Sequence, residues 1–331
     1  MTLSGAFCLC LAALVAGPQP PSGDDPLAEA RALITAGKPA AAIEKLKTLD
    51  TATPRVAEML GVAYYHAGDP LRAIEQLAAV VDKLPEGSLE RREAVQVLGL
   101  SHYLAGHLAE AVPFLEKTRE IAPENLELSY ALGMAYIQTR QPAKARESWA
   151  RTFRTPPDSA AAHLVTAQMM IRAGMDEMAE VELKQALAKD PRLPHVHFLL
   201  GQTALFRGRL DEAVALLQRE IEVSPGDSTA FYRLGDAFAR RLEWDAAIAS
   251  LQRSIWLNPY FSGPYILLGR AYLKKGDTAT AEGMLRRAAQ YDPNNKAAHY
   301  LLGQLLQQTG RTEEARRELE IAAKLPETSD R

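Results

Sequence analysis

Residues 265–293 read YILLGRAYLKKGDTATAEGMLRRAAQYDP, and this stretch decides the fold. Its apolar side chains recur every three or four residues on each side of Gly276, a spacing that predicts two amphipathic helices. Gly276 supplies the left-handed residue that ends the first helix. Small residues at Gly269 and Ala281 let the two helices approach closely, and Leu285 fills the gap between them. The stretch therefore predicts a pair of antiparallel helices.

The same pattern recurs along the chain, with a period of 34 residues from Gly99 onward. Each copy has a small residue in the place of Gly269, an alanine twelve residues later, then a large apolar residue and, in most copies, a closing proline. The nine small residues are Ala30, Gly61, Gly99, Gly133, Ala167, Gly201, Gly235, Gly269 and Gly303. Such a period predicts a repeat architecture in which each helix pair buries its apolar stripe by stacking on its neighbours. The repeats are placed near residues 23–53, 54–91, 92–125, 126–159, 160–193, 194–227, 228–261, 262–295 and 296–329.

One repeat shows the pattern most fully, with Tyr265, Leu268, Gly269, Tyr272, Ala281, Leu285 and Pro293. These residues resemble the signature of the tetratricopeptide repeat family, which is W-x2-L-G-x2-Y followed by A-x3-F and P. The resemblance implies an all-α fold, a right-handed α-solenoid superhelix of antiparallel helix pairs, over residues 23–331. Three histidines stand where the family carries its first aromatic residue, and we expect their rings to pack between helices rather than to bind a metal: His163, His197 and His299.

Two irregularities carry expectations of their own. The longer second repeat suggests that the segment from Pro85 to Arg92 is an extended turn. The last helix has no helix after it, so Ile321 and Leu325 are expected to be partly exposed. This edge gives a possible homo-oligomer through the C-terminal helix, and a well-solvated cap is the alternative.

Residues 1–22 contain no charged side chain, and the 13 residues from Gly5 to Gly17 are apolar or small. This run is too short to span a bilayer, which takes about 20 helical residues. It predicts a signal peptide followed by a flexible linker, and hence an exported protein, periplasmic or extracellular, with no membrane span in the mature chain. The alternative is a chain tethered by an uncleaved N-terminal segment. Both cysteines, Cys8 and Cys10, lie in this segment, so the mature chain would hold no thiolate.

Composition and motifs narrow the classes of function. Lys and Arg number 38 against 41 for Asp and Glu, a formal net charge of −3, which leaves no basic excess for a nucleic acid. We find none of the HExxH, P-loop, GxGxxG or GxSxG motifs. His195 and His197 lie two residues apart and do not share a helix face, so they do not converge on a metal. The sequence predicts neither catalysis nor a cofactor nor a metal site.

The resemblance implies instead that the first helix of each repeat lines a concave groove holding a peptide or protein segment. Carried over by repeat position, the groove residues that we select are Tyr65, Tyr103, Tyr130, Met134, Gln168, Phe198, Gln202, Tyr232, Asp236, Arg240, Arg270, Lys274, Tyr300 and Gln304. Apolar side chains favour pockets for ligand side chains, and Gln side chains can bind backbone amides. Three cations, Arg240, Arg270 and Lys274, fit an acidic side chain or a C-terminal carboxylate.

The leading hypothesis is therefore a non-catalytic scaffold that binds a protein or peptide segment, as part of an exported envelope or secretion assembly. Packing between successive first helices is the alternative for part of the N-terminal half of the groove, which is mostly apolar. A second hypothesis is a glycan-binding accessory of polysaccharide or glycosylation machinery, in which Tyr130, Phe198, Tyr232 and Tyr300 stack on sugars.

Overall fold

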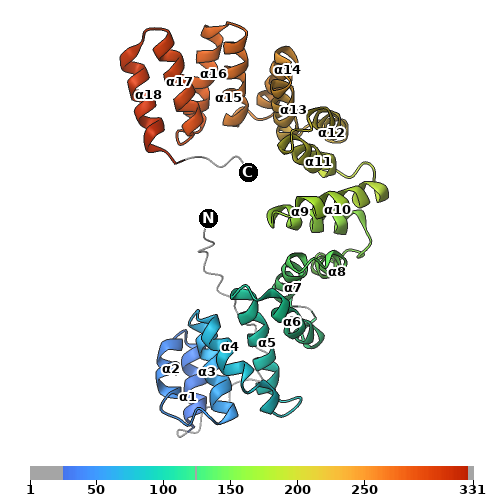
Figure 1. Ribbon diagram of the computed structural model, residues 1–331, viewed down its shortest axis with the longest axis vertical. Helices are drawn as coiled ribbons and strands as arrows, with labels where there is room; N and C mark the ends of the chain where they lie inside the picture. The colour runs from blue at the N-terminus through green and yellow to red at the C-terminus, as the bar shows by residue number, and fades with distance from the viewer. Residues whose placement is uncertain (1–24, 124, 327–331) are drawn as a thin grey trace. The chain divides into compact units, whose positions relative to one another are not determined.

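The computed structural model describes residues 25–123 and 125–326 and is drawn in Figure 1. Within these two ranges the chain forms 18 α-helices and one short 3-10 helix, and no strand. From α1 to α9 and from α11 to α18, each helix contacts the next one in the chain. The predicted all-α solenoid is thereby confirmed. The N-terminal segment of residues 1–22, predicted as a signal peptide and linker, lies outside the described residues.

The helix contacts divide the chain into two compact units, residues 1–182 and 183–331, and the boundary falls within α10 (Asp176–Lys189). In unit 1 the first helices of the pairs are α1 (Pro26–Thr35), α3 (Pro54–His66), α5 (Leu89–Leu104), α7 (Leu126–Gln138) and α9 (Ala160–Arg172). Their partners are α2 (Pro39–Leu46), α4 (Pro70–Ala78), α6 (Leu108–Ile121) and α8 (Pro142–Thr152), with the 3-10 helix at Val81–Lys83.

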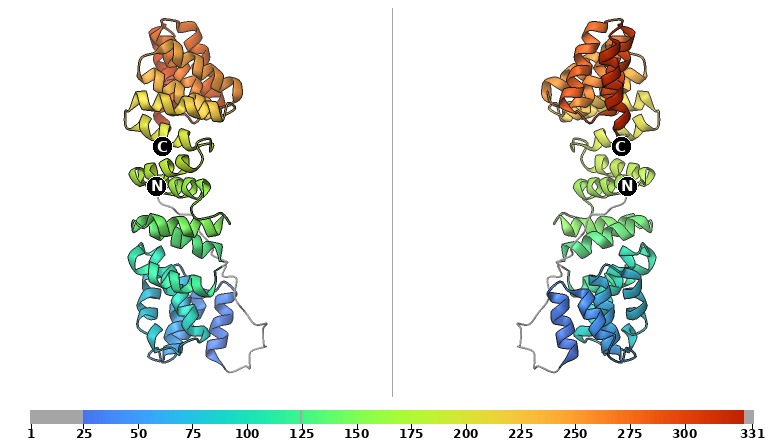
Figure 2. Two further views of the ribbon diagram at one scale, coloured as in Figure 1. Left: turned by 90° about the vertical axis from the view of Figure 1, so that its right-hand side faces the viewer. Right: turned by 90° about the vertical axis from the view of Figure 1, so that its left-hand side faces the viewer.

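In unit 2 the first helices are α11 (Val196–Phe206), α13 (Ser228–Arg240), α15 (Ser262–Lys274) and α17 (Lys296–Gln308). Their partners are α12 (Leu210–Val223), α14 (Trp244–Leu257), α16 (Thr278–Tyr291) and α18 (Thr312–Lys324). Figure 2 shows that successive pairs within each unit stack in chain order. Each pair thus buries its apolar stripe against the pairs before and after it.

The small residue of each repeat sets how closely the two helices of a pair approach. A Cβ built at Gly269 would lie 2.6 Å from the Cγ atom of Leu285, and the same holds at 2.5 Å for Gly235 and Leu251. Real Cβ contacts are never this short, so only glycine fits without a shift. The helix that follows Gly276 begins after a left-handed turn, since Gly276 has a φ of 81°.

Two of the three histidines that replace the first aromatic residue lie in the core, whereas His197 is half-buried. His163 and His299 are buried, and in each the Nδ1 atom lies 2.6 Å from a carboxylate, of Glu182 and Glu318 respectively. The Nε2 atom of His299 lies 3.1 Å from the carbonyl oxygen of Pro293, so the ring ties a helix to the preceding turn. Among the described residues no group of three or more His, Cys, Asp or Glu side chains could hold a metal ion.

The turn before α5 is shorter than predicted. The hydroxyl of Ser88 accepts a hydrogen bond from the backbone N–H of Arg91 at 3.1 Å, which caps the helix at its first residue, Leu89. The prediction of an extended turn as far as Arg92 is therefore wrong over its second half, because the capping serine was not recognised. At the other end of the chain Ile321 is exposed and Leu325 is half-buried, while their neighbours on α18 are mostly charged.

None of the described helices is both long and apolar enough to cross a membrane.

Candidate functional site

The first helices form one layer within each unit, because α3 contacts α1 and α5, and α13 contacts α11 and α15. We call the exposed side chains of this layer the first-helix face, and describe it separately for each unit. All 14 residues selected from the sequence lie on first helices. Five belong to unit 1 and nine to unit 2.

In unit 1 the selected aromatic residues differ in how far they reach solvent. Tyr65 is buried, and burial together with the nearby Glu127 carboxylate raises the pKa of its hydroxyl to about 12. Tyr103 is half-buried, and burial also raises its pKa. Tyr130 is 41% exposed and lies edge-on to Trp149, with 5.1 Å between the ring centroids. Tyr130 alone of these three rings offers a broad contact surface.

In unit 2 the pattern is similar. Phe198 is buried and stacks on the imidazole of His195, with 4.9 Å between the centroids. Tyr232 is half-buried and packs edge-on against Phe261 at 4.9 Å. Tyr300 is 48% exposed and accepts a hydrogen bond at 2.8 Å from the side-chain amide of Gln304. Burial thus places Tyr65 in the packing between helices, the alternative considered for the N-terminal half. Phe198 is buried as well, although that alternative was not considered for it.

The charged side chains of the face in unit 2 fall into two groups. On α13 the guanidinium of Arg240 donates two hydrogen bonds to the carboxylate of Asp236, at 3.1 and 3.0 Å. On α15, one repeat later, the corresponding places are taken by Arg270 and Lys274. Both are exposed, and neither makes a hydrogen bond or ion pair with any other described residue. Asp236 therefore neutralises one of the three predicted cations, and two uncompensated cations remain.

The remaining selected residues are polar or flexible. Met134, Gln168 and Gln202 are half-buried, and Gln304 is exposed. The amide groups of the three glutamines can donate and accept hydrogen bonds, which suits the backbone of an extended polypeptide.

Sequence reasoning missed two exposed aromatic residues at the end of α14. Trp256 is 67% exposed and Tyr260 is 77% exposed, and the guanidinium of Arg253 lies 4.0 Å from the centre of the Trp256 ring. The repeat alignment holds a signal for them. One repeat earlier the same places carry Glu222 and Gly226, so the aromatic residues depart from the pattern.

Sequence reasoning also missed Glu58 on α3. It lies three residues before the small residue of its repeat, at the place that Tyr130, Tyr232 and Tyr300 hold in theirs. Its side chain is fully buried, and neither carboxyl oxygen has a hydrogen-bond partner among the residues that the structure describes. Burial, and next the charge of Glu93, raise its pKa to about 8.

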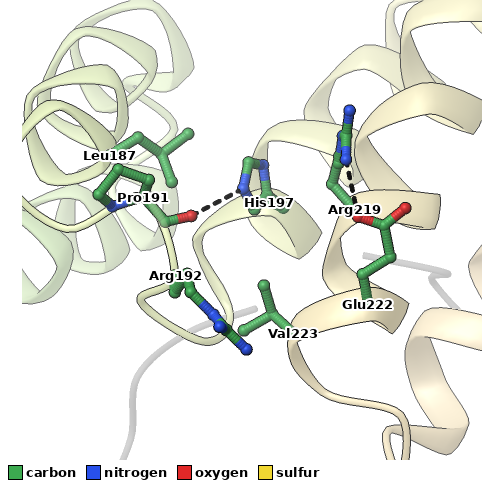
Figure 3. A pocket seen from close by; sticks show the side chains of 7 residues that line it. All are labelled: Leu187, Pro191, Arg192, His197, Arg219, Glu222 and Val223. Atoms are coloured by element: carbon green, nitrogen blue, oxygen red, sulfur yellow. Dashed lines mark hydrogen bonds and ion pairs between the residues drawn. The ribbon is translucent and has the colours of Figure 1, made fainter.

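A separate hollow lies in unit 2 (Figure 3). Its volume is about 450 Å3, and it is lined by Leu187, Pro191, Arg192, His197, Arg219, Glu222 and Val223. The Nε2 atom of His197 lies 3.4 Å from the carbonyl oxygen of Pro191, and Arg219 pairs with Glu222 at 2.7 Å. Its charged side chains are exposed, and no nucleophile and base converge there. None of the residues selected from the sequence lines it.

Models of known families match most of the chain. One tetratricopeptide repeat model matches residues 27–88, 59–125, 177–228 and 198–260, and a second tetratricopeptide repeat model matches residues 102–169 and 272–329. The first of these covers more than half of the chain. The matched segments run through both units.

Curated relatives share only part of their length with this chain. The BBSome complex member BBS4 of Bos taurus is 30% identical over 159 residues, which are 47% of this chain and 30% of the relative. The anaphase-promoting complex subunit 3 of Schizosaccharomyces pombe is 30% identical over 105 residues, 32% of this chain and 16% of the relative. The match thus spans less than a third of either protein.

Solved structures of other proteins align with parts of this chain. Pseudomonas aeruginosa pilF aligns with a TM-score of 0.50 and 21% identity, over 62% of this chain and 94% of that one. A crystal structure of MamA aligns with a TM-score of 0.44 and 25% identity, over 48% of this chain and 92% of that one.

Proposed function

This chain belongs to the tetratricopeptide repeat family, and from that premise we propose that it is a non-catalytic scaffold whose first-helix face binds a protein or peptide segment. The repeat fold supports a role in protein–protein interaction, and proteins of this family are generally non-catalytic scaffolds. The exposed part of the face combines aromatic rings, amides and cations, which is the mixture that a polypeptide ligand needs.

The observation that carries the proposal is the pair of uncompensated cations on α15. Arg270 and Lys274 lie four residues apart, so they share one side of the helix. One repeat on, α17 presents Tyr300 and Gln304 at its exposed surface. An acidic side chain or a C-terminal carboxylate of the ligand would pair with the cations, while amide groups bind its backbone. We therefore assign an acidic segment to unit 2.

Neutralising one of these cations should weaken binding of an acidic polypeptide. We expect Lys274→Gln to reduce affinity about tenfold, because an exposed charge-assisted contact to a ligand is worth about 1.5 kcal/mol. Lys275→Gln is the matched control, since it removes the same charge from the next residue, whose ammonium pairs with Asp245 on α14. Affinities for the partner recovered by crosslinking, measured by calorimetry, compare the two variants. Equal affinities for both variants and the unaltered chain would refute the assignment of an acidic segment to unit 2.

We also propose that the protein is exported and acts in an envelope or secretion assembly. The apolar segment before residue 18 supports export. The alternative is a chain that stays tethered because this segment is not cleaved. Mass spectrometry of the native N-terminus is expected to find a chain that begins at Gly17, after cleavage behind Ala16. A native chain that begins at Met1 would refute removal of the segment.

Fewer aromatic rings are exposed than the glycan-binding alternative assumes. Of the four aromatic residues predicted to stack on sugars, Phe198 is buried and Tyr232 is half-buried, which leaves Tyr130 and Tyr300 exposed. Binding to a glycan array in the absence of any polypeptide partner would favour this second function.

A further inference from the structure

The buried carboxyl group of Glu58 is the starting point. None of the other eight repeats holds a charged side chain at this place on the first helix, and four of them hold an aromatic ring there. A buried carboxyl group without a hydrogen bond costs stability, whether it is ionised or not. Within residues 25–123 and 125–326, neither oxygen of the buried Glu58 carboxyl group has a hydrogen-bond partner. Such a group indicates a site that is completed by something outside the chain.

Side chains from neighbouring first helices surround it. The guanidinium of Arg31 on α1 donates hydrogen bonds of 3.1 and 2.7 Å to the carboxylate of Glu93 on α5, so this pair connects helices on both sides of α3. A second pair, Arg55 on α3 with Glu90 on α5, joins at 2.5 Å. These four groups are the charges that act on Glu58.

The cluster is one cation short. It contains three carboxyl groups and two guanidiniums, and each guanidinium is already paired with a carboxylate other than Glu58. At neutral pH Glu58 therefore holds a proton in place of a counter-ion, which accords with its raised pKa. The side chains of Arg31 and Glu93 are 47% and 23% exposed, so rotation of this pair would let a ligand side chain approach Glu58.

Taking the proposed polypeptide binding as given, we propose that Glu58 and Glu93 receive a basic side chain of the bound polypeptide, an alkylguanidinium or alkylammonium group. On binding, the proton of the Glu58 carboxyl group leaves for solvent, and the carboxylate forms an ion pair with the incoming cation. The net charge of the cluster is unchanged, because one cation enters and one proton departs. Unit 1 would thereby select a basic residue of the ligand, a different chemistry from the acidic segment assigned to unit 2.

Two peptides that differ in one charge test the proposal on the full chain. The probes are acetyl-Gly-Gly-Arg-Gly-Gly-amide and the same peptide with citrulline, which has the shape of arginine without its charge. We expect the arginine peptide to bind about tenfold more tightly at pH 7, and to release about one proton, measured by calorimetry in two buffers that differ in ionisation enthalpy.

Substitution of Glu58 distinguishes binding of a cation at this site from a nonspecific attraction between the chain and a cation. In Glu58→Gln both the tenfold preference and the proton release should vanish. Glu75→Gln is the control, since it makes the same change at an exposed residue of α4 in the same helix pair, and it should keep both. Equal binding of the two peptides to the unaltered chain, or a preference that survives in Glu58→Gln, would overturn the proposal. Either result leaves polypeptide binding by unit 2 intact, because that is read from Lys274→Gln.

Discussion

Glu58→Gln is expected to stabilise the folded chain at pH 7 by on the order of 3 kcal/mol. The pKa of Glu58 rises from its ordinary value of 4.5 to about 8 on folding. Between these two values the unfolded chain loses the proton while the folded chain keeps it, so the free energy of unfolding falls by about 1.4 kcal/mol per pH unit as pH rises. Glutamine has no proton to lose and removes this dependence.

Urea unfolding from pH 4 to pH 9 measures the effect. Glu58→Gln and the unaltered chain should agree near pH 4, diverge as pH rises to 8, and stay apart by a constant amount above it. Glu90→Gln is a control for which the expected change in the free energy of unfolding has the opposite sign. The backbone hydrogen bond at the start of α5, and then Arg55, lower the pKa of Glu90. That carboxylate stabilises the fold above pH 4.5, and its loss should destabilise the chain at pH 7. Equal stability of Glu58→Gln and the unaltered chain at pH 7 would contradict the burial of this group.

Gly269→Ala is expected to lower the free energy of unfolding by about 1 to 3 kcal/mol. The new Cβ atom would lie 2.6 Å from Cγ and 2.8 Å from Cδ2 of Leu285, a buried side chain with no room to withdraw. Forcing extra volume into a packed core separates the helices or drives a side chain away from its preferred rotamer. The helices α15 and α16 would therefore move apart.

Gly283→Ala on α16 is the matched control, because a Cβ there meets no atom within 4 Å. Alanine has the higher helix propensity, so this change should stabilise the chain by about 0.5 to 1 kcal/mol. The two variants add the same methyl group to the same helix pair and should shift the urea midpoint in opposite directions. Destabilisation by both, or by neither, would show that close helix approach at Gly269 is not what the repeat requires.

The fold could be predicted because the residues that set the packing of a helix pair recur at fixed positions in the repeat. From Gly99 onward a small residue recurs every 34 positions, followed by an alanine and a large apolar residue, and this pattern resembles that of a family built from antiparallel helix pairs. The repeat position also predicted packed rings for three histidines. His163 and His299 lie buried beside a carboxylate, whereas His197 is half-buried. The start of α5 was misplaced because Ser88 was not recognised as its cap.

The candidate site could be predicted only in part. Repeat position shows which helix carries a residue but not how far its side chain is buried, so Tyr65 and Tyr300 received the same role although one is buried and the other exposed. The pairing of Arg240 with Asp236 was within reach, since the two lie four residues apart on one helix. The bridge from Arg31 to Glu93 was not, because it spans 62 residues of sequence and joins helices on both sides of α3.

The central claim is that the first-helix face binds a polypeptide, and photo-crosslinking tests it most directly. The photoreactive residue p-azidophenylalanine would replace Tyr300 on the face of unit 2, or Tyr260 at the end of α14 as the control. Both are exposed tyrosines of the same unit. We predict that irradiation in cells joins the chain to a specific polypeptide from Tyr300 and not from Tyr260, with crosslinked peptides identified by mass spectrometry. Crosslinks to a polypeptide from Tyr260 alone, or equally from both places, would contradict the claim.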